Sequence, residues 1–217
     1  VLAQNNYPQG VSCILNGDAV LGHKLCQDVR IPLISATGST RMGRSIGVTV
    51  AERFGKSILE LGGNNAIIIS ETADLKKVLP AIVFGAVGTA GQRCTSTRRL
   101  IIHESKYAEV RQVMQKAYGQ LRIGNPLDQQ NHVGPLIDKR AVEIYLKALE
   151  QIKIQGGNML VEGGVIEGAD YTNGCYVRPC IAEVKSDMKI VHDETFAPIL
   201  YLMTYKTLDE AISIQNN

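Results

Sequence analysis

The chain has 217 residues, of which 45% are hydrophobic and 20% are charged, and its 23 basic and 21 acidic residues leave a formal charge of +2. This near balance provides no basic face for nucleic acid or a membrane surface, and no apolar run approaches the roughly 20 residues that span a bilayer. The five cysteines include no C-x-x-C pair, and the four histidines lack ligand-like spacing. We therefore predict reduced thiols, no metal site and no nucleic-acid or membrane partner, in the cytoplasm or, in a eukaryote, the mitochondrial matrix.

Strands and helices alternate over the first sixty residues. Short runs rich in β-branched residues predict strands at 10–17, 29–39 and 56–63, and helical periodicity predicts helices at 18–28 and 40–55. Such alternation is typical of a parallel sheet with crossover helices. Because sixty residues make only about two such units, and the first residue is not methionine, we expect a fragment that begins within a Rossmann-like domain.

The doublet Gly62-Gly63 predicts a junction between two domains, residues 1–61 and 62–217. A second α/β series follows it. The expected strands are 65–70, 98–104, 158–164, 176–184 and 198–205, and the expected helices are 72–88, 105–121, 138–157 and 207–217.

Two candidate groups follow strands of the first series. Gly38 and Ser39 come after a strand and open a helix, where unpaired N–H groups suit a phosphate. The alternative is that Ser39 only caps the helix. Glu60 ends a strand at the carboxyl edge of a sheet, where desolvation would raise its pKa and make it a usable general base. An edge glutamate is, however, more often a solvated surface group.

Cys94 lies in a polar, glycine-containing loop, GTAGQRCTSTRRL, between an apolar helix and a strand. The neighbouring Arg93 and nearby backbone N–H groups favour the nucleophilic thiolate. A buried, inert thiol is the usual alternative for a free cysteine, and Cys13 and Cys26, in apolar surroundings, fit that alternative better. If one thiol in this chain reacts, we expect it to be Cys94.

The segment HDETFAPIL at 192–200 places Glu194 and Phe196 in a loop before a strand. An exposed acid beside an aromatic ring could hold a ribose and a flat ring. It could equally be an ordinary loop. Composition leaves both interpretations open.

Taken together, ELGG at 60–63, GQRC at 91–94 and ETFAP at 194–198 resemble, in this order, the signature set of the NAD(P)-dependent aldehyde dehydrogenases. TGST at 37–40 matches the coenzyme-phosphate turn of that superfamily, which the chain resembles over essentially its whole length. ELGGNNAIII and GTAGQRCTSTRRL resemble the antiquitin-type branch, the α-aminoadipic semialdehyde dehydrogenases. The resemblance implies an α/β fold in which residues 1–61 form the C-terminal part of a Rossmann-like coenzyme domain. Residues 62–217 would form a catalytic domain with a parallel-rich sheet, truncated at its C-terminus.

The resemblance also implies roles in catalysis. Cys94 would attack the aldehyde carbon to give a thiohemiacetal, hydride would pass to the nicotinamide, and Glu60 would activate the water that hydrolyses the thioester. The backbone N–H of Cys94 would help to hold the oxyanion. Arg93 would bind the carboxylate end of a substrate such as 2-aminoadipate 6-semialdehyde, because a guanidinium pairs bidentately with a carboxylate. A surface arginine that only raises the local potential is the alternative for Arg93.

For the coenzyme, NAD with NADP not excluded, the resemblance implies that Gly38 and Ser39 contact the pyrophosphate. Leu61 would supply a backbone contact close to the nicotinamide ring, Glu194 would bind the nicotinamide ribose, and Phe196 would pack near the ring. The family's oxyanion asparagine and ribose-binding lysine precede this chain, so we expect the fragment alone to be inactive and the full-length protein to be an active homo-oligomer, tetramer or dimer.

Two other interpretations compete with hydrolytic aldehyde oxidation. Some eye-lens crystallins resemble aldehyde dehydrogenases and serve as structural proteins, but such a protein has no need for Cys94, Glu60 and Glu194 together. Coenzyme-A-acylating or phosphorylating oxidation needs no water-activating base, so Glu60 disfavours it.

Overall fold

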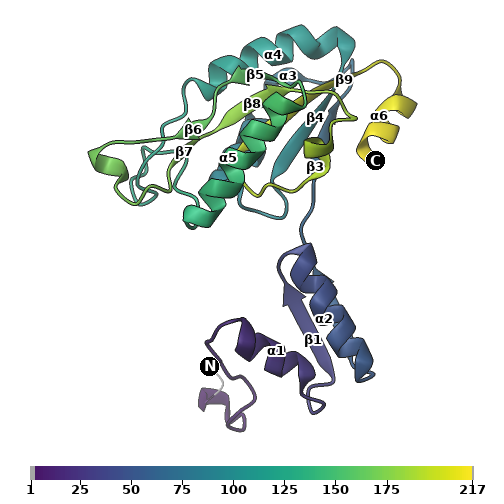
Figure 1. The fold of residues 1–217 in the computed structure, drawn as a ribbon, viewed down its shortest axis with the longest axis vertical. Helices are drawn as coiled ribbons and strands as arrows, with labels where there is room; N and C mark the ends of the chain where they lie inside the picture. The colour runs from purple at the N-terminus through teal and green to yellow at the C-terminus, as the bar shows by residue number, and fades with distance from the viewer. Residues whose placement is uncertain (1–2, 217) are drawn as a thin grey trace. The chain divides into compact units, whose positions relative to one another are not determined.

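The computed structural model describes residues 3–216, which divide into two compact units at Gly62 and Gly63. The elements are shown in Figure 1. The first unit contains η1 (Ala3–Asn5), α1 (Ala19–Gln27), β1 (Leu33–Thr37), α2 (Thr40–Glu52) and β2 (Lys56–Glu60). The second contains β3 (Asn65–Ile69), α3 (Leu75–Val87), η2 (Gly88–Gly91), β4 (Thr97–His103), α4 (Glu104–Tyr118), α5 (Lys139–Ile154), β5 (Asn158–Val161), β6 (Gly164–Val165), η3 (Ala169–Tyr171), β7 (Val177–Arg178), β8 (Cys180–Glu183), η4 (Lys189–His192), β9 (Ile199–Tyr205) and α6 (Leu208–Asn216).

In the first unit, β1 and β2 pair in parallel through the crossover helix α2, as the alternation predicted. Asp18 caps α1 by accepting hydrogen bonds from the backbone N–H groups of Val20 and Leu21. The predicted strand at 10–17 is wrong, because these residues form turns and irregular backbone. A β-branched run becomes a strand only where another strand supplies ladder hydrogen bonds, and none pairs with it among the described residues.

The second unit is built on a five-stranded sheet in the order β3-β4-β9-β8-β5. The first four strands are parallel and β5 is antiparallel to β8, so the predicted mixed α/β fold with a parallel-rich sheet is confirmed. Every residue of the inner strand β4, which lies between β3 and β9, is buried except His103. This burial explains why its sequence shows no alternation of polar and apolar residues.

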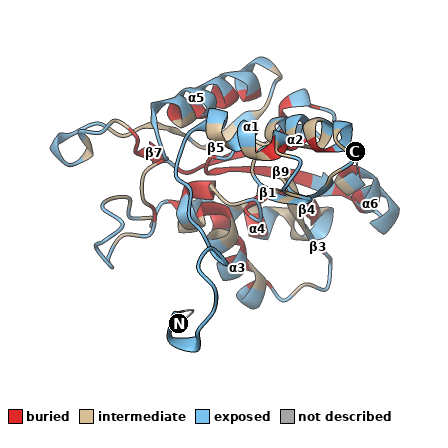
Figure 2. Cartoon of the chain, turned by 90° about the horizontal axis from the view of Figure 1, so that it is seen from below, coloured by how far each residue is buried: buried red, intermediate tan, exposed pale blue. Residues whose placement is uncertain are grey.

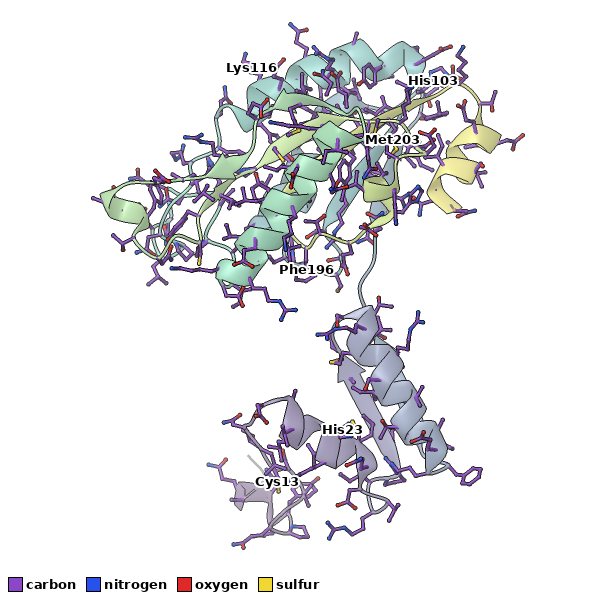
Figure 3. The ribbon with its side chains drawn as sticks, viewed as in Figure 1. Cys13, His23, His103, Lys116, Phe196 and Met203 are labelled. Carbon is purple, nitrogen blue, oxygen red and sulfur yellow. The ribbon has the colours of Figure 1, made fainter. Side chains whose placement is uncertain are left out.

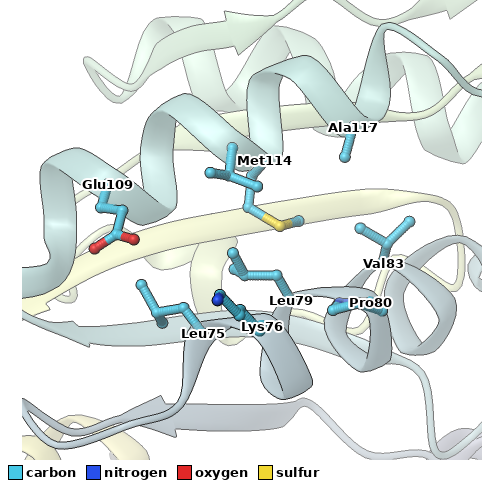
Figure 4. A pocket seen from close by; sticks show the side chains of 9 residues that line it. Leu75, Lys76, Leu79, Pro80, Val83, Glu109, Met114 and Ala117 are labelled. Atoms are coloured by element: carbon cyan, nitrogen blue, oxygen red, sulfur yellow. The ribbon is translucent and has the colours of Figure 1, made fainter.

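Helices cover both faces of this sheet and enclose a core. In Figures 1 and 2, α3 and α4 lie on one face and α5 lies on the other. Leu100, Ile101 and Ile102 of β4 are completely buried. Between α3 and α4, a groove of about 350 Å³ separates Leu79 from Met114 (Figure 4). Among the described residues, no helix is both long and apolar enough to cross a membrane.

Several predicted boundaries shift. The predicted strand 176–184 is broken into β7 and β8 at Pro179, which has no N–H to donate to a ladder. The predicted helix 72–88 begins at Leu75, because Asp74 caps it by accepting from the Lys76 N–H. The last predicted helix is α6, and residue 217 of that prediction lies outside the described residues.

Candidate active site

The candidate residues of the second unit gather at the amino edge of its sheet. Because β3, β4 and β9 are parallel neighbours, the segments that precede them meet at one edge. These segments are Gly63–Asn64, Arg93–Ser96 and Glu194–Pro198. Segments that lie roughly 30 and roughly 100 residues apart in the sequence therefore come together at this edge.

Cys94 lies in the loop between η2 and β4, and its thiol is exposed rather than packed in the core. The Asn65 side-chain amide donates to the Cys94 carbonyl at 2.6 Å and to the Ser96 carbonyl at 3.0 Å. The Arg93 N–H donates to the Ser96 hydroxyl, and the Ser96 N–H donates back to the Arg93 carbonyl. Among the hydrogen bonds within residues 3–216, none is donated by the Cys94 N–H. The loop is thus held by its carbonyls, and the N–H beside the thiol remains available as an oxyanion donor.

Three consecutive residues ahead of this loop have positive φ angles: Thr89 at 54°, Ala90 at 52° and Gly91 at 70°. This left-handed turn ends α3 and directs the chain toward Cys94. A Cβ at Gly91 would lie 2.5 Å from the Ala197 carbonyl oxygen and 2.8 Å from the Pro198 nitrogen. Gly91 therefore lets the turn pack directly on the Ala197–Pro198 peptide. This contact joins the thiol loop, residues 93–96, to the ETFAP segment.

Arg93 points away from the thiol loop toward the end of α3. Its guanidinium lies 5.1 Å from the centre of the Phe84 ring and donates to the Phe84 carbonyl at 3.3 Å. A Cβ at Gly88 would overlap this guanidinium, so the glycine provides its space. Arg93 lines a cavity of about 550 Å³ with Phe84, Gly88, Gln120 and His132. The Arg93 Nε is buried without a hydrogen-bond partner among the described residues, so this arginine retains donor capacity.

Glu194 and Phe196 lie in the loop between η4 and β9, where Figure 3 labels Phe196. Glu194 Oε1 accepts from the Gly63 N–H at 3.1 Å and is paired with the Arg98 guanidinium at 3.1 Å. Phe196 has a φ of 56°, and its ring lies 5.5 Å from the Arg98 guanidinium. The side chain of Glu194 is 22% exposed, so this carboxylate is neither free in solvent nor fully enclosed.

The first unit carries the remaining candidates. Ser39 caps α2, because its hydroxyl accepts from the Met42 N–H at 3.2 Å. The Gly38 N–H donates to the Glu60 carbonyl at 3.0 Å, which places the two candidate segments side by side at the carboxyl ends of β1 and β2. The Glu60 side chain is exposed, and the Leu61 side chain packs on Gly43 of α2. Beside them, a cavity of about 770 Å³ lies between α1, β1 and α2, with His23 and Arg41 among its lining residues.

The aldehyde dehydrogenase family model matches residues 1–217, the whole chain. The chain belongs to the aldehyde dehydrogenase family. Among curated members, it is 46% identical over 217 residues to aldehyde dehydrogenase family 7 member A1 of Pisum sativum, covering all of this chain and 42% of the relative. It is 46% identical to the alpha-aminoadipic semialdehyde dehydrogenase of Bos taurus, covering all of this chain and 40% of that relative. The predicted resemblance to the antiquitin-type branch is thereby confirmed.

A solved family structure confirms the predicted fold. The betaine aldehyde dehydrogenase of Staphylococcus aureus, in complex with NAD+, superposes with a TM-score of 0.87 at 25% identity, over 90% of this chain and 39% of that chain. The chain therefore spans about two fifths of the length of the aldehyde dehydrogenases that it matches. Both curated relatives are dehydrogenases by name, so the crystallin-like alternative finds no support among them.

Sequence reasoning missed two residues of the site and misjudged one cysteine. Asn65 and Arg98 hold the thiol loop, but nothing in their local sequence distinguishes them from an ordinary strand amide and a surface arginine. Pairing β3 beside β4 would have placed Asn65 near Thr97. Cys26 is buried as expected, whereas Cys13 is exposed, because the expected strand around it does not form.

Proposed function

We propose that the full-length protein oxidises an aldehyde to a carboxylic acid with NAD+ as the coenzyme. The observation that carries this proposal is the exposed Cys94 thiol beside its own unpaired backbone N–H, on a loop held by Asn65. A nucleophile and an oxyanion donor that are fixed together stabilise a tetrahedral adduct, a geometry worth several kcal/mol in other acyl-transfer sites.

In the proposed mechanism, Cys94 Sγ attacks the aldehyde carbon as the thiolate, and the Cys94 N–H donates to the oxygen that becomes negative. NAD+, when bound, supplies the two-electron acceptor for that carbon. Glu60 then removes a proton from a water molecule, whose oxygen attacks the thioester carbonyl, and the Cys94 thiolate leaves as the acid forms.

The residues present fit a dinucleotide. The turn at Gly38 and Ser39 precedes α2, whose first N–H groups have no partner within the helix and whose dipole favours an anion such as pyrophosphate. The adjacent cavity of about 770 Å³ is largely apolar, which suits a flat base. In the second unit, Glu194 offers a carboxylate to ribose hydroxyls, and Phe196 offers an exposed ring. We therefore assign residues 1–61 to the coenzyme domain and 62–217 to the catalytic domain.

For the substrate, we propose a semialdehyde with a carboxylate at its far end, such as 2-aminoadipate 6-semialdehyde. Arg93 lies next to the nucleophile in sequence and lines a cavity of about 550 Å³ with an unpartnered Nε, so a carboxylate is the natural partner for it. The name of the Bos taurus relative supports the same substrate class.

The first experiment measures NADH formation by the full-length protein and by its Cys94→Ala and Cys13→Ala variants. Both thiols are exposed, but only Cys94 lies in the candidate site, so we expect the first variant to lose activity and the second to keep it. NADH formation that survives in Cys94→Ala would refute the nucleophile. Glu60→Gln should still release one equivalent of NADH in a burst and then stop, whereas unchanged turnover would exclude Glu60 as the base.

A second experiment tests the substrate class. Arg93→Met should lower kcat/KM for the acidic semialdehyde by about a hundredfold, the scale of a lost charged hydrogen-bond pair, and should leave a simple aliphatic aldehyde nearly unaffected. An equal loss on both aldehydes would assign Arg93 to general positioning instead. Homo-oligomerisation and cytoplasmic or mitochondrial location stay predictions, which light scattering and microscopy of the full-length protein address.

A further inference from the structure

The guanidinium of Arg98 is a buried charge at the centre of the candidate site. The side chain is 3% exposed, although arginine is almost never fully buried unless it is paired. Burial lowers the pKa of Arg98, while the nearby Glu194 and Cys94 act in the opposite direction. Such an ion is retained only where several partners satisfy it.

Those partners come from both segments of the site. Arg98 donates to the Ser96 carbonyl at 3.0 Å and to the Arg93 carbonyl at 3.0 Å, on either side of Cys94. The Nη2 that donates to Arg93 also pairs with Glu194 at 3.1 Å, and the guanidinium lies against the Phe196 ring. This group thus links the thiol loop to the ETFAP segment through Nη2 while Nη1 holds the Ser96 carbonyl, a set of contacts that a single ammonium could not make with the same geometry.

The pairing also determines which oxygen of Glu194 remains available. Oε1 receives both the Gly63 N–H and the Arg98 guanidinium, whereas no hydrogen bond or ion pair among the described residues engages Oε2. A carboxylate held by one oxygen presents the other in a fixed direction. Without Arg98, the Glu194 side chain would keep one backbone hydrogen bond and regain rotational freedom.

We propose that Arg98 is a positioning residue that orients Glu194 for the coenzyme ribose and ties this carboxylate to the Cys94 loop. The inference rests on the proposed function in that Glu194 is taken as the ribose ligand. The contact between Arg98 and Glu194 is independent of that assignment, so the two can be tested separately.

The test is a double-mutant cycle in the full-length protein with Arg98→Met, Glu194→Gln and the combined variant. Calorimetry measures the dissociation constant for NAD+. We expect Arg98→Met to weaken binding roughly tenfold, within the range of coupling between contacting residues. In the Glu194→Gln background, its further effect should be less than about twofold.

Arg99→Met is the matched control. Arg99 is equally buried on the same strand, but its side chain donates to the carbonyls of Asn64 and Ile214 instead of to Glu194. The effect of Arg99→Met on NAD+ binding should be the same in the wild-type and Glu194→Gln backgrounds. If the effects of Arg98→Met and Glu194→Gln are additive, or if Arg98→Met binds NAD+ as the wild type does, the proposal is overturned.

A second readout needs no coenzyme. Because the Gly63 N–H donates to the same Glu194 oxygen, Arg98→Met should accelerate deuterium exchange of the peptide containing Gly63 by roughly tenfold. The combined variant should exchange no faster than Glu194→Gln alone. If the wild type fails to bind NAD+, the proposed function fails, whereas the exchange cycle still decides the role of Arg98.

Arg98→Lys keeps the test decisive if the methionine variant does not fold. A lysine has one nitrogen in place of the two that contact Ser96 and Glu194, so it cannot keep every contact. We expect a smaller loss of NAD+ binding, about threefold and still coupled to Glu194. A lysine variant with wild-type binding and wild-type Gly63 exchange would overturn the proposal.

Discussion

The two units differ both in how much they bury and in which ends of their strands carry the candidate residues. In the first unit, Cys26 and Val50 are the only buried hydrophobic residues among those described, whereas the second unit encloses a continuous core around β4, β8 and β9 (Figure 2). The first unit presents Gly38 and Glu60 at the carboxyl ends of its strands. The second presents Cys94 and Glu194 ahead of its strands, at their amino ends.

This contrast shows that the two kinds of candidate residue have different structural support. The thiol loop is held by side chains that are themselves packed, such as Arg98, so its geometry depends on the core beneath it. The Gly38-Ser39 turn of the first unit depends mainly on backbone, namely a helix N-terminus and one cap. Perturbations of packing should therefore affect the second unit far more than the first.

The largest expected difference comes from two glycines that both have positive φ. Gly91 contacts the Ala197–Pro198 peptide, whereas a Cβ at Gly10 would meet nothing within 4 Å. We expect Gly91→Ala to cost roughly 3 kcal/mol of unfolding free energy or more, because backbone must move. It should also remove most NADH formation in the full-length protein. Gly10→Ala should cost only about 1 kcal/mol, from its left-handed backbone. Equal losses in urea unfolding would contradict the importance of the Gly91 contact.

A smaller effect is expected from alkaline pH, and it belongs to the second unit. Burial raises the pKa of the Cys180 thiol from 9.0 to about 12. Since the folded-state pKa is above the unfolded value, the contribution of Cys180 is fully present below pH 9 and is lost as pH rises toward 12. Stability should fall by up to about 1.4 kcal/mol per pH unit in this window.

Urea unfolding of the wild type and Cys180→Ala at several alkaline pH values measures this slope. The variant should be less stable near neutral pH, because it leaves a cavity, and should lose stability less steeply above pH 9. Parallel pH profiles would show that Cys180 ionises as easily in the folded protein as in the unfolded chain.

The smallest expected effect on stability occurs at acidic pH and concerns the first unit. The Arg30 guanidinium, 2.6 Å from Asp28, lowers the pKa of that carboxyl to about 2. A depressed pKa contributes stability above the ordinary value of 3.8 that is lost as pH falls toward 2. At this surface site, we expect a local change only. Nuclear magnetic resonance titration should show the Asp28 pKa returning toward 3.8 in Arg30→Gln, and an unchanged pKa would remove Arg30 as the cause.

Most helices and strands were predictable because their patterns are local. The apolar run of β4 and the periodicity of α5 report burial directly, and Asp138 caps α5 through the Ala141 N–H. The segment 10–17 shows the limit of such patterns, because a strand also needs a partner that the local sequence does not reveal. Pro179 divides a run that hydrophobicity alone predicts as one strand.

Site residues could be predicted where their immediate sequence neighbours mark them. They could not be predicted where contacts between distant segments define their role. Cys94 stands out in a polar loop, and Ser39 stands out before a helix. Asn65 and Arg98 become meaningful only when β3, β4 and β9 lie side by side. The packing of Gly91 on Ala197 depends on the same pairing, and no short motif records it.

Because Cys94 and Glu194 lie at the amino edge of the five-stranded sheet, substitutions at the two edges of this sheet should differ in their effect on the candidate site. The opposite edge carries the strand-to-helix junctions at His103–Glu104 and at Lys206–Thr207, each a full strand length from the thiol loop. We therefore expect tags or fluorophores attached near those junctions to disturb the Cys94 loop less than changes at the amino edge. For protein engineering, that far edge is the natural attachment point.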